Sequence, residues 1–555
     1  MTATVDRQAA LGAATLCEAF QITAGARAEN VALRTPGGSV EISFAQYAER
    51  VRRIAGGLAA LGVRRGDTLA LMMLNRPEFH LVDTAAMHLG ATPFSIYNTS
   101  SPEQIAQLLE NAASRVAVCE SRFLDAVRAA RPPGLEHVVL VEELAELEQQ
   151  GRANFDFEEA WRGVRPDDVL TLIYTSGTTG PPKGVQLTHA NMLAEARAVA
   201  AVLPPHTDGR HTSYLPHAHV ADRFFGHYFA SIFNGATVTD VPDVREVIAV
   251  LAEVRPTGWG SVPRIWEKLK AGLEARGVED PSALPEQAKA AIREQIGLDQ
   301  AEWLVCGAAP IAEEVLEYFR DLGLPIRELF GMSELSCCAT INPVDDIRIG
   351  TVGRALPGVE LELAPDGELL CRGPIVMSGY RGDPEKTAEA IDAEGWLHTG
   401  DIAEIDADGF VRIVDRKKEL IINAAGKNMS PANIELRLKS ASPLIGQAIC
   451  IGDRRPFNVA LIALDPDAAR AWAASHGRAD PAAAALAADP ELQSAVAGAV
   501  DEANRHLSRV EQVKRHLILP VDWLPGGDEL TPTMKLRRKP IEAKYATEIA
   551  SLYAP

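Results

Sequence analysis

Residues 174–184 of the chain read Tyr-Thr-Ser-Gly-Thr-Thr-Gly-Pro-Pro-Lys-Gly, and this stretch decides how the rest of the sequence is interpreted. It follows an apolar run at 169–173, Val-Leu-Thr-Leu-Ile, which is typical of a buried strand. Glycines let backbone N–H groups approach an anion closely, hydroxyls add donors, and the lysine adds positive charge. The stretch therefore predicts a phosphate-binding loop after a strand. It does not fit the common P-loop pattern G-x-x-x-x-G-K-[ST], and a flexible surface turn is the alternative interpretation.

The groups that this loop offers to an ATP phosphate are hydroxyls, backbone N–H groups and one ammonium. They belong to Thr175, Ser176, Gly177, Thr178, Thr179, Gly180 and Lys183. The whole stretch resembles the phosphate-binding signature of the adenylate-forming superfamily, which contains acyl-CoA synthetases, luciferases and the adenylation domains of peptide synthetases. The resemblance also places Thr178 among the catalytic residues.

Length and composition limit the class of protein. At 555 residues the chain exceeds one hydrophobic core, so two or more domains are expected. A hydrophobic fraction of 47% and a charged fraction of 23% are typical of a globular protein. The net charge of −20 argues against nucleic acid or an anionic membrane as the main partner.

Cysteine usage and the N-terminus indicate the compartment. The seven cysteines lack metal-ligand spacing, and the adjacent pair Cys337-Cys338 does not suggest a structural disulfide. We find no signal peptide and no apolar run of membrane-spanning length. A cytoplasmic location is expected, with peripheral contact at the inner membrane surface left open.

The order of local patterns predicts an α/β fold. A helix is expected over 43–61 with Ser43 as its cap, then a strand at 67–72 and a helix at 77–89. Short buried strands are expected at 237–239 and 303–305, and this alternation implies a mostly parallel sheet wrapped by helices. From about residue 350 the sequence pattern changes to one that predicts short strands with Asp-Gly turns. The Ala-rich stretch 470–505 predicts surface helices of a small domain.

Further motifs supply what carboxylate activation requires. A carboxylate is a poor electrophile, and attaching AMP gives it a good leaving group, so the site must bind ATP, Mg²⁺, the acid and the charge that develops. In the run 330–334, Phe330 offers a ring face for adenine and Glu334 a hard oxygen ligand for Mg²⁺. This run resembles the family's aromatic-Gly-x-Thr/Ser-Glu motif, with Phe where Tyr is common. The nucleotide-binding candidates here are Phe330, Gly331, Met332 and Ser333.

Two more segments are candidates for the nucleotide. Small residues at 307–309, Gly307, Ala308 and Ala309, follow a predicted strand, where ligands bind open α/β sheets. A helix-packing turn is the alternative there. Asp401 follows a tight glycine and is suited to two ribose hydroxyls, and Arg416 adds a cation near ribose or phosphate. The spacing between these two residues matches the family order.

Two further segments offer catalytic residues. The segment 214–220, Tyr-Leu-Pro-His-Ala-His-Val, resembles the family segment that presents an aromatic or His residue beside the carboxylate. We choose His219 by position, although His217 stands where long-chain enzymes often carry an apolar residue, and a structural role for either histidine is the alternative. Near the C-terminus, Lys535 matches the family's catalytic lysine, with Met534 replacing the usual glycine. It would bridge the carboxylate and the α-phosphate as pyrophosphate leaves.

The resemblance implies an architecture of two parts. A large N-terminal domain of stacked α/β subdomains with a β-barrel-like part would occupy 1–415, and a small mobile α+β lid would occupy 416–555. The hinge would lie at 415–418, with Lys418 at the family's hinge position. Rotation of the lid would bring the loop 423–427 to the site, where Gly426 leaves room for the pantetheine of coenzyme A.

The implied activity is ATP-dependent ligation of a fatty acid to coenzyme A through an acyl-adenylate. The string 261–269, Ser-Val-Pro-Arg-Ile-Trp-Glu-Lys-Leu, resembles the long-chain branch. Medium-chain or aryl acids, and transfer to a carrier protein acting in trans, remain alternatives within the enzyme class. A non-catalytic nucleotide sensor is the alternative from another class.

Overall fold

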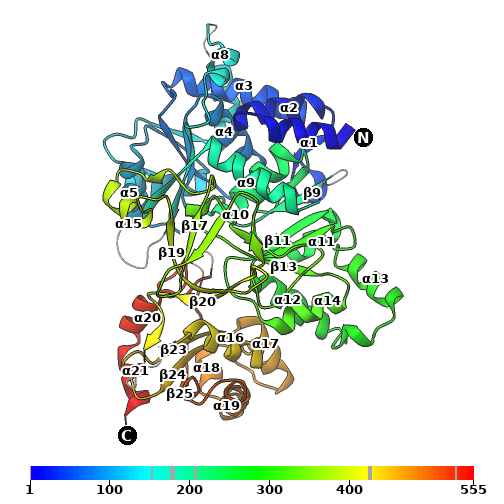
Figure 1. Cartoon of the computed structure of the whole chain (residues 1–555), viewed down its shortest axis with the longest axis vertical. Coiled ribbons are helices and arrows are strands. Elements are labelled where there is room, and N and C mark those ends of the chain that lie inside the picture. Colours follow the sequence, from blue (N-terminus) through cyan, green and yellow to red (C-terminus); the bar gives the residue numbers. More distant parts are fainter. Residues whose placement is uncertain are drawn as a thin grey trace.

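The structure is a computed structural model that describes residues 2–151, 154–175, 182–204, 209–422, 428–524, 526–531 and 534–554. Figure 1 shows a large part, coloured blue to yellow-green, and beneath it a smaller part, coloured yellow to red, that contains the C-terminus. The phosphate loop at 176–181 and the loop at 423–427 lie outside the described residues.

The largest sheet carries the predicted phosphate loop. Its order is β18-β8-β7-β4-β3-β5-β6. The strands from β7 to β6 pair in parallel, whereas β8 and β18 add to the edge in antiparallel fashion. The strands are β3 (Thr68–Met72), β4 (Thr92–Ser95), β5 (Val116–Cys119), β6 (His137–Leu140), β7 (Val169–Thr175), β8 (Lys183–Thr188) and β18 (Gly379–Tyr380).

The N-terminal helices begin where the sequence indicates. The Ser43 hydroxyl accepts from the backbone N–H of Gln46, and the Gln46 side chain accepts from that of Ser43, so both donors at the start of α3 are satisfied. The helix predicted over 43–61 is confirmed as α3, the strand predicted over 67–72 as β3, and the helix predicted over 77–89 as α4. The α-helices up to α9 are α1 (Thr2–Gly12), α2 (Leu16–Ala26), α3 (Phe44–Ala60), α4 (Pro77–His88), α5 (Pro102–Ala112), α6 (Leu124–Ala130), α7 (Leu144–Gln149), α8 (Phe157–Arg162) and α9 (His189–Val202).

Two further α/β sheets complete the stacked arrangement. One has the order β2-β1-β10-β9 and the other β11-β12-β13-β14-β15. Their strands are β1 (Val31–Arg34), β2 (Glu41–Ser43), β9 (Arg210–Ser213), β10 (Thr237–Asp240), β11 (Gly258–Ser261), β12 (Trp303–Cys306), β13 (Ile326–Phe330), β14 (Thr340–Ile341) and β15 (Arg354–Ala355). The helices between them are α10 (Val220–Asp222), the π-helix η4 (Arg223–Phe233), α11 (Val247–Val254), α12 (Pro263–Glu274), α13 (Glu286–Gln295) and α14 (Glu313–Asp321).

The predicted barrel-like part is an open antiparallel sheet. Its order is β16-β17-β19-β20, and within the described chain no pairing closes it from β20 back to β16. Its elements, with the helix inserted before β19, are β16 (Glu360–Leu363), β17 (Glu368–Arg372), α15 (Pro384–Ala390), β19 (Leu397–Ile405) and β20 (Val411–Arg416). The change of sequence pattern near residue 350 lies shortly before the first strand of this sheet.

The smaller part is α+β. It has a two-stranded ribbon and a three-stranded sheet of order β23-β24-β25. Its elements are β21 (Ile421–Ile422), β22 (Asn428–Met429), α16 (Pro431–Ala441), β23 (Ile445–Ile451), β24 (Asn458–Leu464), α17 (Pro466–Ser475), α18 (Ala483–Ala487), α19 (Pro490–Arg505), β25 (Val513–Ile518), α20 (Arg538–Lys544) and α21 (Ala546–Tyr553). The Ala-rich stretch is helical as predicted, and a separate hydrophobic cluster lies between its helices and the sheet.

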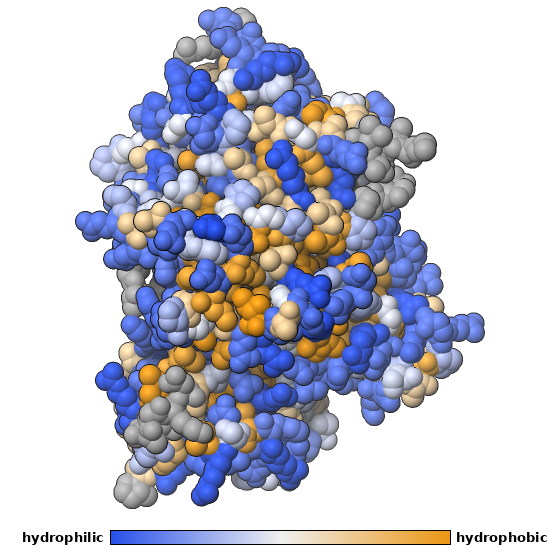
Figure 2. All heavy atoms as spheres, in the orientation of Figure 1, coloured by the Kyte–Doolittle hydropathy of each residue, from blue (hydrophilic) through white to orange (hydrophobic). Residues whose placement is uncertain are grey.

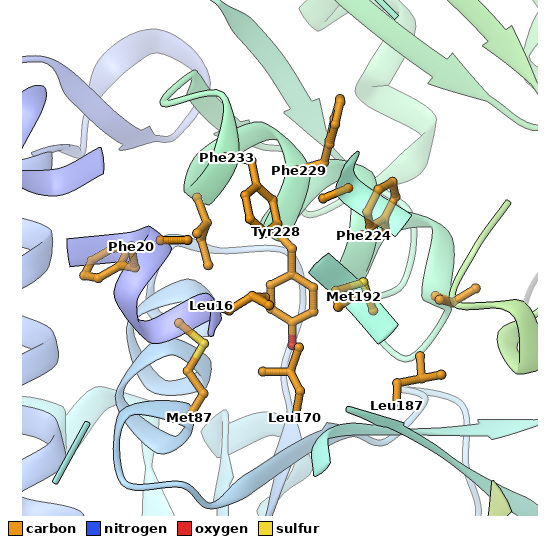
Figure 3. Close-up of a cluster of buried hydrophobic side chains, with 14 of the residues drawn as sticks. Leu16, Phe20, Met87, Leu170, Leu187, Met192, Phe224, Tyr228, Phe229 and Phe233 are labelled. Atoms are coloured by element: carbon orange, nitrogen blue, oxygen red, sulfur yellow. The ribbon is translucent and has the colours of Figure 1, made fainter. Parts of the chain in front are cut away.

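The main hydrophobic core joins helices to the largest sheet. Figure 3 shows Tyr228 of η4 between Leu16 of α2 and Met192 of α9, with Leu170 of β7 beneath. All four are fully buried. Figure 2 shows a face that is hydrophilic at its upper and lower ends, with hydrophobic residues gathered across its middle. No described helix has the length and apolar character needed to cross a membrane.

Candidate active site

The predicted phosphate loop joins β7 to β8 as a hairpin. Thr175, half-buried at the end of β7, pairs with Lys183 at the start of β8. The candidates between them, Ser176, Gly177, Thr178, Thr179 and Gly180, lie outside the described residues. The Lys183 ammonium lies 4.6 Å from the centre of the Tyr380 ring, which is cation–π distance. The hairpin therefore brings its lysine to the edge strand β18.

Tyr380 also contacts the predicted metal ligand. Its hydroxyl donates to Oε1 of Glu334 at 2.8 Å. Burial and the neighbouring Glu334 carboxylate raise the pKa of Tyr380, so the hydroxyl keeps its proton and remains a donor. Glu334 lies in the short 3₁₀ helix η7 (Ser333–Leu335) after β13 and is 7% exposed. The Tyr380 hydrogen bond fixes the orientation of this carboxylate.

The adenine candidates lie at one edge of a parallel sheet. Gly307–Ala309 follow β12 and Phe330–Ser333 end or follow β13, and these strands pair in parallel. A Cβ at Gly331 would lie 1.7 Å from the carbonyl oxygen of Cys337, so this turn requires glycine. A Cβ at Gly307 would lie 2.5 Å from Cδ1 of Leu329. The parallel pairing of β12 and β13 places the two candidate segments at the same edge of the sheet.

The ribose candidates face each other across an antiparallel pair. Asp401 of β19 is in register with Arg416 of β20, and Nε of Arg416 lies 3.1 Å from Oδ1 of Asp401. Burial raises the pKa of Asp401, and the positive charges of Arg416 and Lys535 partly offset this rise. Asp401 is 5% exposed, whereas Arg416 is exposed. A buried carboxylate beside an accessible guanidinium is suited to bind vicinal hydroxyls.

Lys535 reaches this site from the C-terminal part. Its backbone N–H donates to Oγ1 of Thr531 at 3.0 Å, and its carbonyl accepts from the Thr531 N–H at 2.8 Å. Met534, which stands where the family has glycine, has φ = +65°. That left-handed conformation costs a non-glycine residue roughly 1–2 kcal/mol. The structure thus shows why glycine is usual there.

The charges around Lys535 are those of the predicted site. Burial, and then the positive charge of Arg416, lower the pKa of Lys535, and Asp401, Glu419 and Glu334 oppose this effect. The side chain lies among the charged groups of the site, although the residue as a whole is exposed to solvent. Its ammonium is therefore within electrostatic range of the predicted metal ligand and of the predicted ribose ligands.

The two histidines of the segment 214–220 have different surroundings. His219 is half-buried, its Nδ1 accepts from the N–H of Ala221 at 3.2 Å, and burial and the Lys535 charge lower its pKa to about 3. His217 is 4% exposed and its ring stacks on Phe79, with centroids 3.5 Å apart. The structure thus brings His219 to Lys535 and leaves His217 in the core.

Ion pairs join the C-terminal part to helices α12 and α14. Lys268 Nζ lies 3.0 Å from Oδ2 of Asp467, and Arg264 pairs with Asp465. Arg437 of α16 pairs with Glu314 at 3.1 Å, and Lys439 with Glu267 at 3.9 Å. We name these four contacts the interdomain ion pairs. Together with Leu436 of α16, which packs on the hydrophobic cluster of α12 and α14, they join the part that carries Lys535 to the larger part.

The predicted hinge lies at the turn after β20. The N–H of Lys417 donates to the carbonyl of Gly400, and those of Glu419 and Leu420 donate to the carbonyl of Arg416. Lys418 is exposed in this turn. Gly426, the candidate for the coenzyme A channel, lies outside the described residues.

Sequence reasoning missed Tyr380. Its role depends on the pairing of β18 with β8, in which Tyr380 lies opposite Val185, a residue almost 200 positions earlier in the chain. The local signal, a tyrosine between Gly379 and Arg381, is common to many turns. Only the tertiary arrangement gives it a partner.

Comparison with known families identifies the class. Residues 20–381 match the family described as AMP-binding enzyme, and residues 418–555 match the AMP-binding enzyme C-terminal domain. The chain therefore belongs to the AMP-binding enzyme family, and the predicted adenylate-forming superfamily is confirmed.

The relatives of this chain include two mycobacterial proteins named as fatty-acid–CoA ligases. The chain is 51% identical over 436 residues to a Mycobacterium tuberculosis protein named as a fatty-acid–CoA ligase, fadD11, covering 72% of this chain and 76% of that protein. It is 35% identical over 557 residues to the long-chain-fatty-acid–CoA ligase FadD15 of Mycobacterium bovis, covering 92% of each.

Solved structures share the fold at low identity. The anthranilate CoA ligase AuaEII in complex with anthranoyl-AMP is similar with a TM-score of 0.78 at 20% identity, covering 97% of this chain and 98% of that one. The A-PCP didomain of the carboxylic acid reductase of Segniliparus rugosus has a TM-score of 0.80 at 19% identity, covering 99% and 84%. These similarities confirm the predicted fold class.

We predict that Tyr380→Phe weakens the use of magnesium. Without the phenol, the Glu334 carboxylate is no longer held, and a hydrogen bond to a charged group contributes about 1.5–3 kcal/mol. The magnesium concentration for half-maximal pyrophosphate release should rise at least tenfold. Tyr318→Phe is the matched control, because that hydroxyl donates to Val278 in another part of the fold. An unchanged magnesium dependence in Tyr380→Phe would contradict the role of Tyr380.

We also predict a shift in the alkaline limb of the curve that relates the rate of adenylation to pH. A lysine is cationic below its pKa, so a lowered pKa makes the rate fall at a lower pH than for an ordinary lysine. Arg416→Gln removes a neighbouring positive charge, so the limb should move upward by on the order of half a pH unit. Pyrophosphate release at saturating ATP, from about pH 7 to about pH 10, measures it. Arg412→Gln, an exposed arginine on the same strand, is the control. A limb that stays in place in Arg416→Gln would show that another group titrates.

Proposed function

We propose that this enzyme ligates a long-chain fatty acid to coenzyme A in two half-reactions. In the first, the carboxylate attacks the α-phosphate of ATP to give acyl-AMP and pyrophosphate. In the second, the coenzyme A thiol attacks the acyl carbonyl and AMP leaves. The observation that carries the proposal is the position of Lys535 beside Asp401, Arg416 and His219.

Lys535 has the role of charge stabilisation in adenylation. Negative charge builds on the α-phosphate and on the leaving pyrophosphate, and a fixed ammonium stabilises it more than water does. Asp401 would accept from the ribose hydroxyls, and Arg416 would neutralise charge nearby. Lys183 and the phosphate loop would hold the β- and γ-phosphates.

Glu334 is suited to hold magnesium. It offers a hard carboxylate oxygen, it is buried, and Tyr380 already fixes one of its two oxygens. When bound, Mg²⁺ would neutralise phosphate charge. The chain's own contribution is to orient this carboxylate towards the nucleotide.

His219 would line the acid site as an uncharged side chain. Because its pKa lies at about 3, the imidazole is uncharged at physiological pH. The negative charge of the incoming carboxylate would then be matched by Lys535 and not by a second cation. His219 would help to position the acid.

The second half-reaction would require the lid to move. We assign 1–415 to the adenylating domain, 416–555 to the lid, and the hinge to 415–418. Rotation at Lys418 would withdraw Lys535, break the interdomain ion pairs and bring the loop with Gly426 to the site. That loop would admit pantetheine.

The choice of acid rests on the named relatives and on the string 261–269. Fatty-acid–CoA ligases of two mycobacteria cover most of the chain. Medium-chain and aryl acids, and a carrier-protein acceptor, are the competing outcomes of the test.

We predict that an acid panel separates these outcomes. Acetate, a series of fatty acids up to stearate, and cinnamate are each supplied with ATP and coenzyme A, and AMP release is measured. The kcat/KM should rise with chain length, because each buried methylene contributes about 0.8 kcal/mol. A maximum at cinnamate or a short acid would contradict the long-chain assignment. Adenylation without AMP release would point to a carrier-protein acceptor, and no pyrophosphate release with any acid would indicate a sensor.

The two half-reactions should respond differently to two variants. Lys535→Ala should lose about 3 kcal/mol or more of transition-state stabilisation in adenylation alone. Lys418→Pro fixes φ at the hinge and removes an N–H, so it should keep acyl-AMP formation and lose most transfer to coenzyme A. Each variant is timed with ATP and fatty acid, and separately with preformed acyl-AMP and coenzyme A.

Lys418→Ala is the matched control for the hinge. It removes the same exposed side chain but leaves the backbone free to rotate. It should therefore run both half-reactions like the wild type. Equal losses in both half-reactions for Lys535→Ala and Lys418→Pro would rule out the alternating lid.

A further inference from the structure

A cluster of two histidines and one aspartate lies buried in the fold, and one of its histidines lies two residues before His219. His80 comes from α4, His217 from the loop between β9 and α10, and Asp240 from the end of β10. One ligand atom of each residue lies within 4.8 Å of the others. His80 and Asp240 are 0% exposed and His217 is 4% exposed. We name these residues the histidine–aspartate cluster.

Polar atoms of the cluster are left without partners. Within the part of the chain that the structure describes, neither Nε2 of His217 nor Oδ2 of Asp240 has a hydrogen bond, whereas Nδ1 of His217 lies beside Asp222. Burying such groups unpaired costs roughly 1–3 kcal/mol each. Most buried polar groups in proteins are paired, so these orphaned atoms indicate a bound group that satisfies them.

The outer nitrogen of His217 faces a carboxylate, and that of His80 faces His227, which in turn contacts a carboxylate. Nδ1 of His217 lies 3.0 Å from Oδ2 of Asp222, which leaves Nε2 directed elsewhere. Nδ1 of His80 lies 2.8 Å from Nδ1 of His227, whose Nε2 lies 3.1 Å from Oδ1 of Asp83. Metal-binding histidines are usually oriented by such outer carboxylates, directly or through a relay.

The inner atoms converge in the manner of metal ligands. Nε2 of His80 lies 2.9 Å from Oδ1 of Asp240. The rings of His80 and His217 are 5.5 Å apart at 83°. Phe79 stacks on the His217 ring and fixes its plane. Two imidazoles and one carboxylate are a common ligand set for zinc.

We propose that His80, His217 and Asp240 bind one zinc ion. The cation would bind Nε2 of His80, Nε2 of His217 and a carboxylate oxygen of Asp240. His80 would then be the Nδ1–H tautomer that donates to Nδ1 of His227, His227 would donate from Nε2 to Asp83, and a proton held between Nε2 of His80 and Asp240 would leave to solvent. Asp240 and Asp222 would offset the charge of the dication. The ion would tie the segment 213–223, which carries His219, to α4 and β10.

A second cluster competes for a metal. Glu195, Cys337 and Cys338 also bring ligand atoms together in the buried core. There, however, Oε1 of Glu195 already accepts from the Cys338 N–H at 2.8 Å, and the two sulfurs are neighbours at 3.6 Å. Oε2 of Glu195 is also without a partner, but among the described residues no side chain from outside this cluster hydrogen-bonds to its three ligands. The experiment distinguishes the two clusters by the atoms bound to the metal.

The full chain is produced without a histidine tag in zinc-supplemented cells and desalted, and its metals are counted by plasma mass spectrometry. The wild type and Cys337→Ala should each hold about one zinc per chain. The zinc content of His217→Leu and of Asp240→Asn should be at least about fivefold lower. X-ray absorption at the zinc edge should show nitrogen and oxygen ligands at about 2.0–2.2 Å and no sulfur at about 2.3 Å.

His476→Gln is the matched control, since it removes an exposed histidine far from the cluster in sequence. Circular dichroism and gel filtration check that each variant is folded. Zinc-free wild type, sulfur in the first shell, or full zinc in folded His217→Leu would each overturn the proposal. The absorption measurement needs only the wild type, so the test stands even where a variant fails to fold.

Discussion

The position of Lys535 depends on weak contacts made at a distance from it. The interdomain ion pairs bind α12 and α14 to α16 and α17, and most of their side chains are partly exposed. Exposed pairs contribute about 0–1 kcal/mol each. The four pairs together contribute at most about 4 kcal/mol, and Leu436 of α16 adds an apolar contact with the cluster of α12 and α14. Under the proposed lid movement, a larger apolar interface would oppose the withdrawal of Lys535.

Much of the fold follows from local signals. The serine and glutamine at the start of α3 satisfy each other's backbone donors within four residues, so no distant contact is needed to place that helix. The turn at Gly331 could also be predicted, because a glycine after an aromatic residue suits a close turn. In the structure, the Cys337 carbonyl occupies the space that a side chain at this position would take. Met534 was visible as a departure from the family, although only its φ of +65° shows the strain.

Other parts of the site could not be predicted, because they join distant segments. Tyr380 meets Glu334 only through the pairing of β18 with β8. His80 and Asp240 are 160 residues apart, and neither lies in a recognisable motif. A short-range pattern reports which side chains share a helix face or a turn. It does not report which strands become neighbours in a sheet.

His219 and Lys535 differ in how firmly the fold holds the segments that carry them. His219 follows a segment that the core anchors: the Ser213 hydroxyl donates to Asp222, and Asn75 donates to both Ser213 and Asp222. Buried polar networks contribute more to a unique arrangement than to stability. Lys535 instead sits on a part held by separable ion pairs. Under the proposed mechanism, the side of the site that positions the acid would stay constant through both half-reactions, and Lys535, which would be needed for adenylation alone, would be the group that leaves.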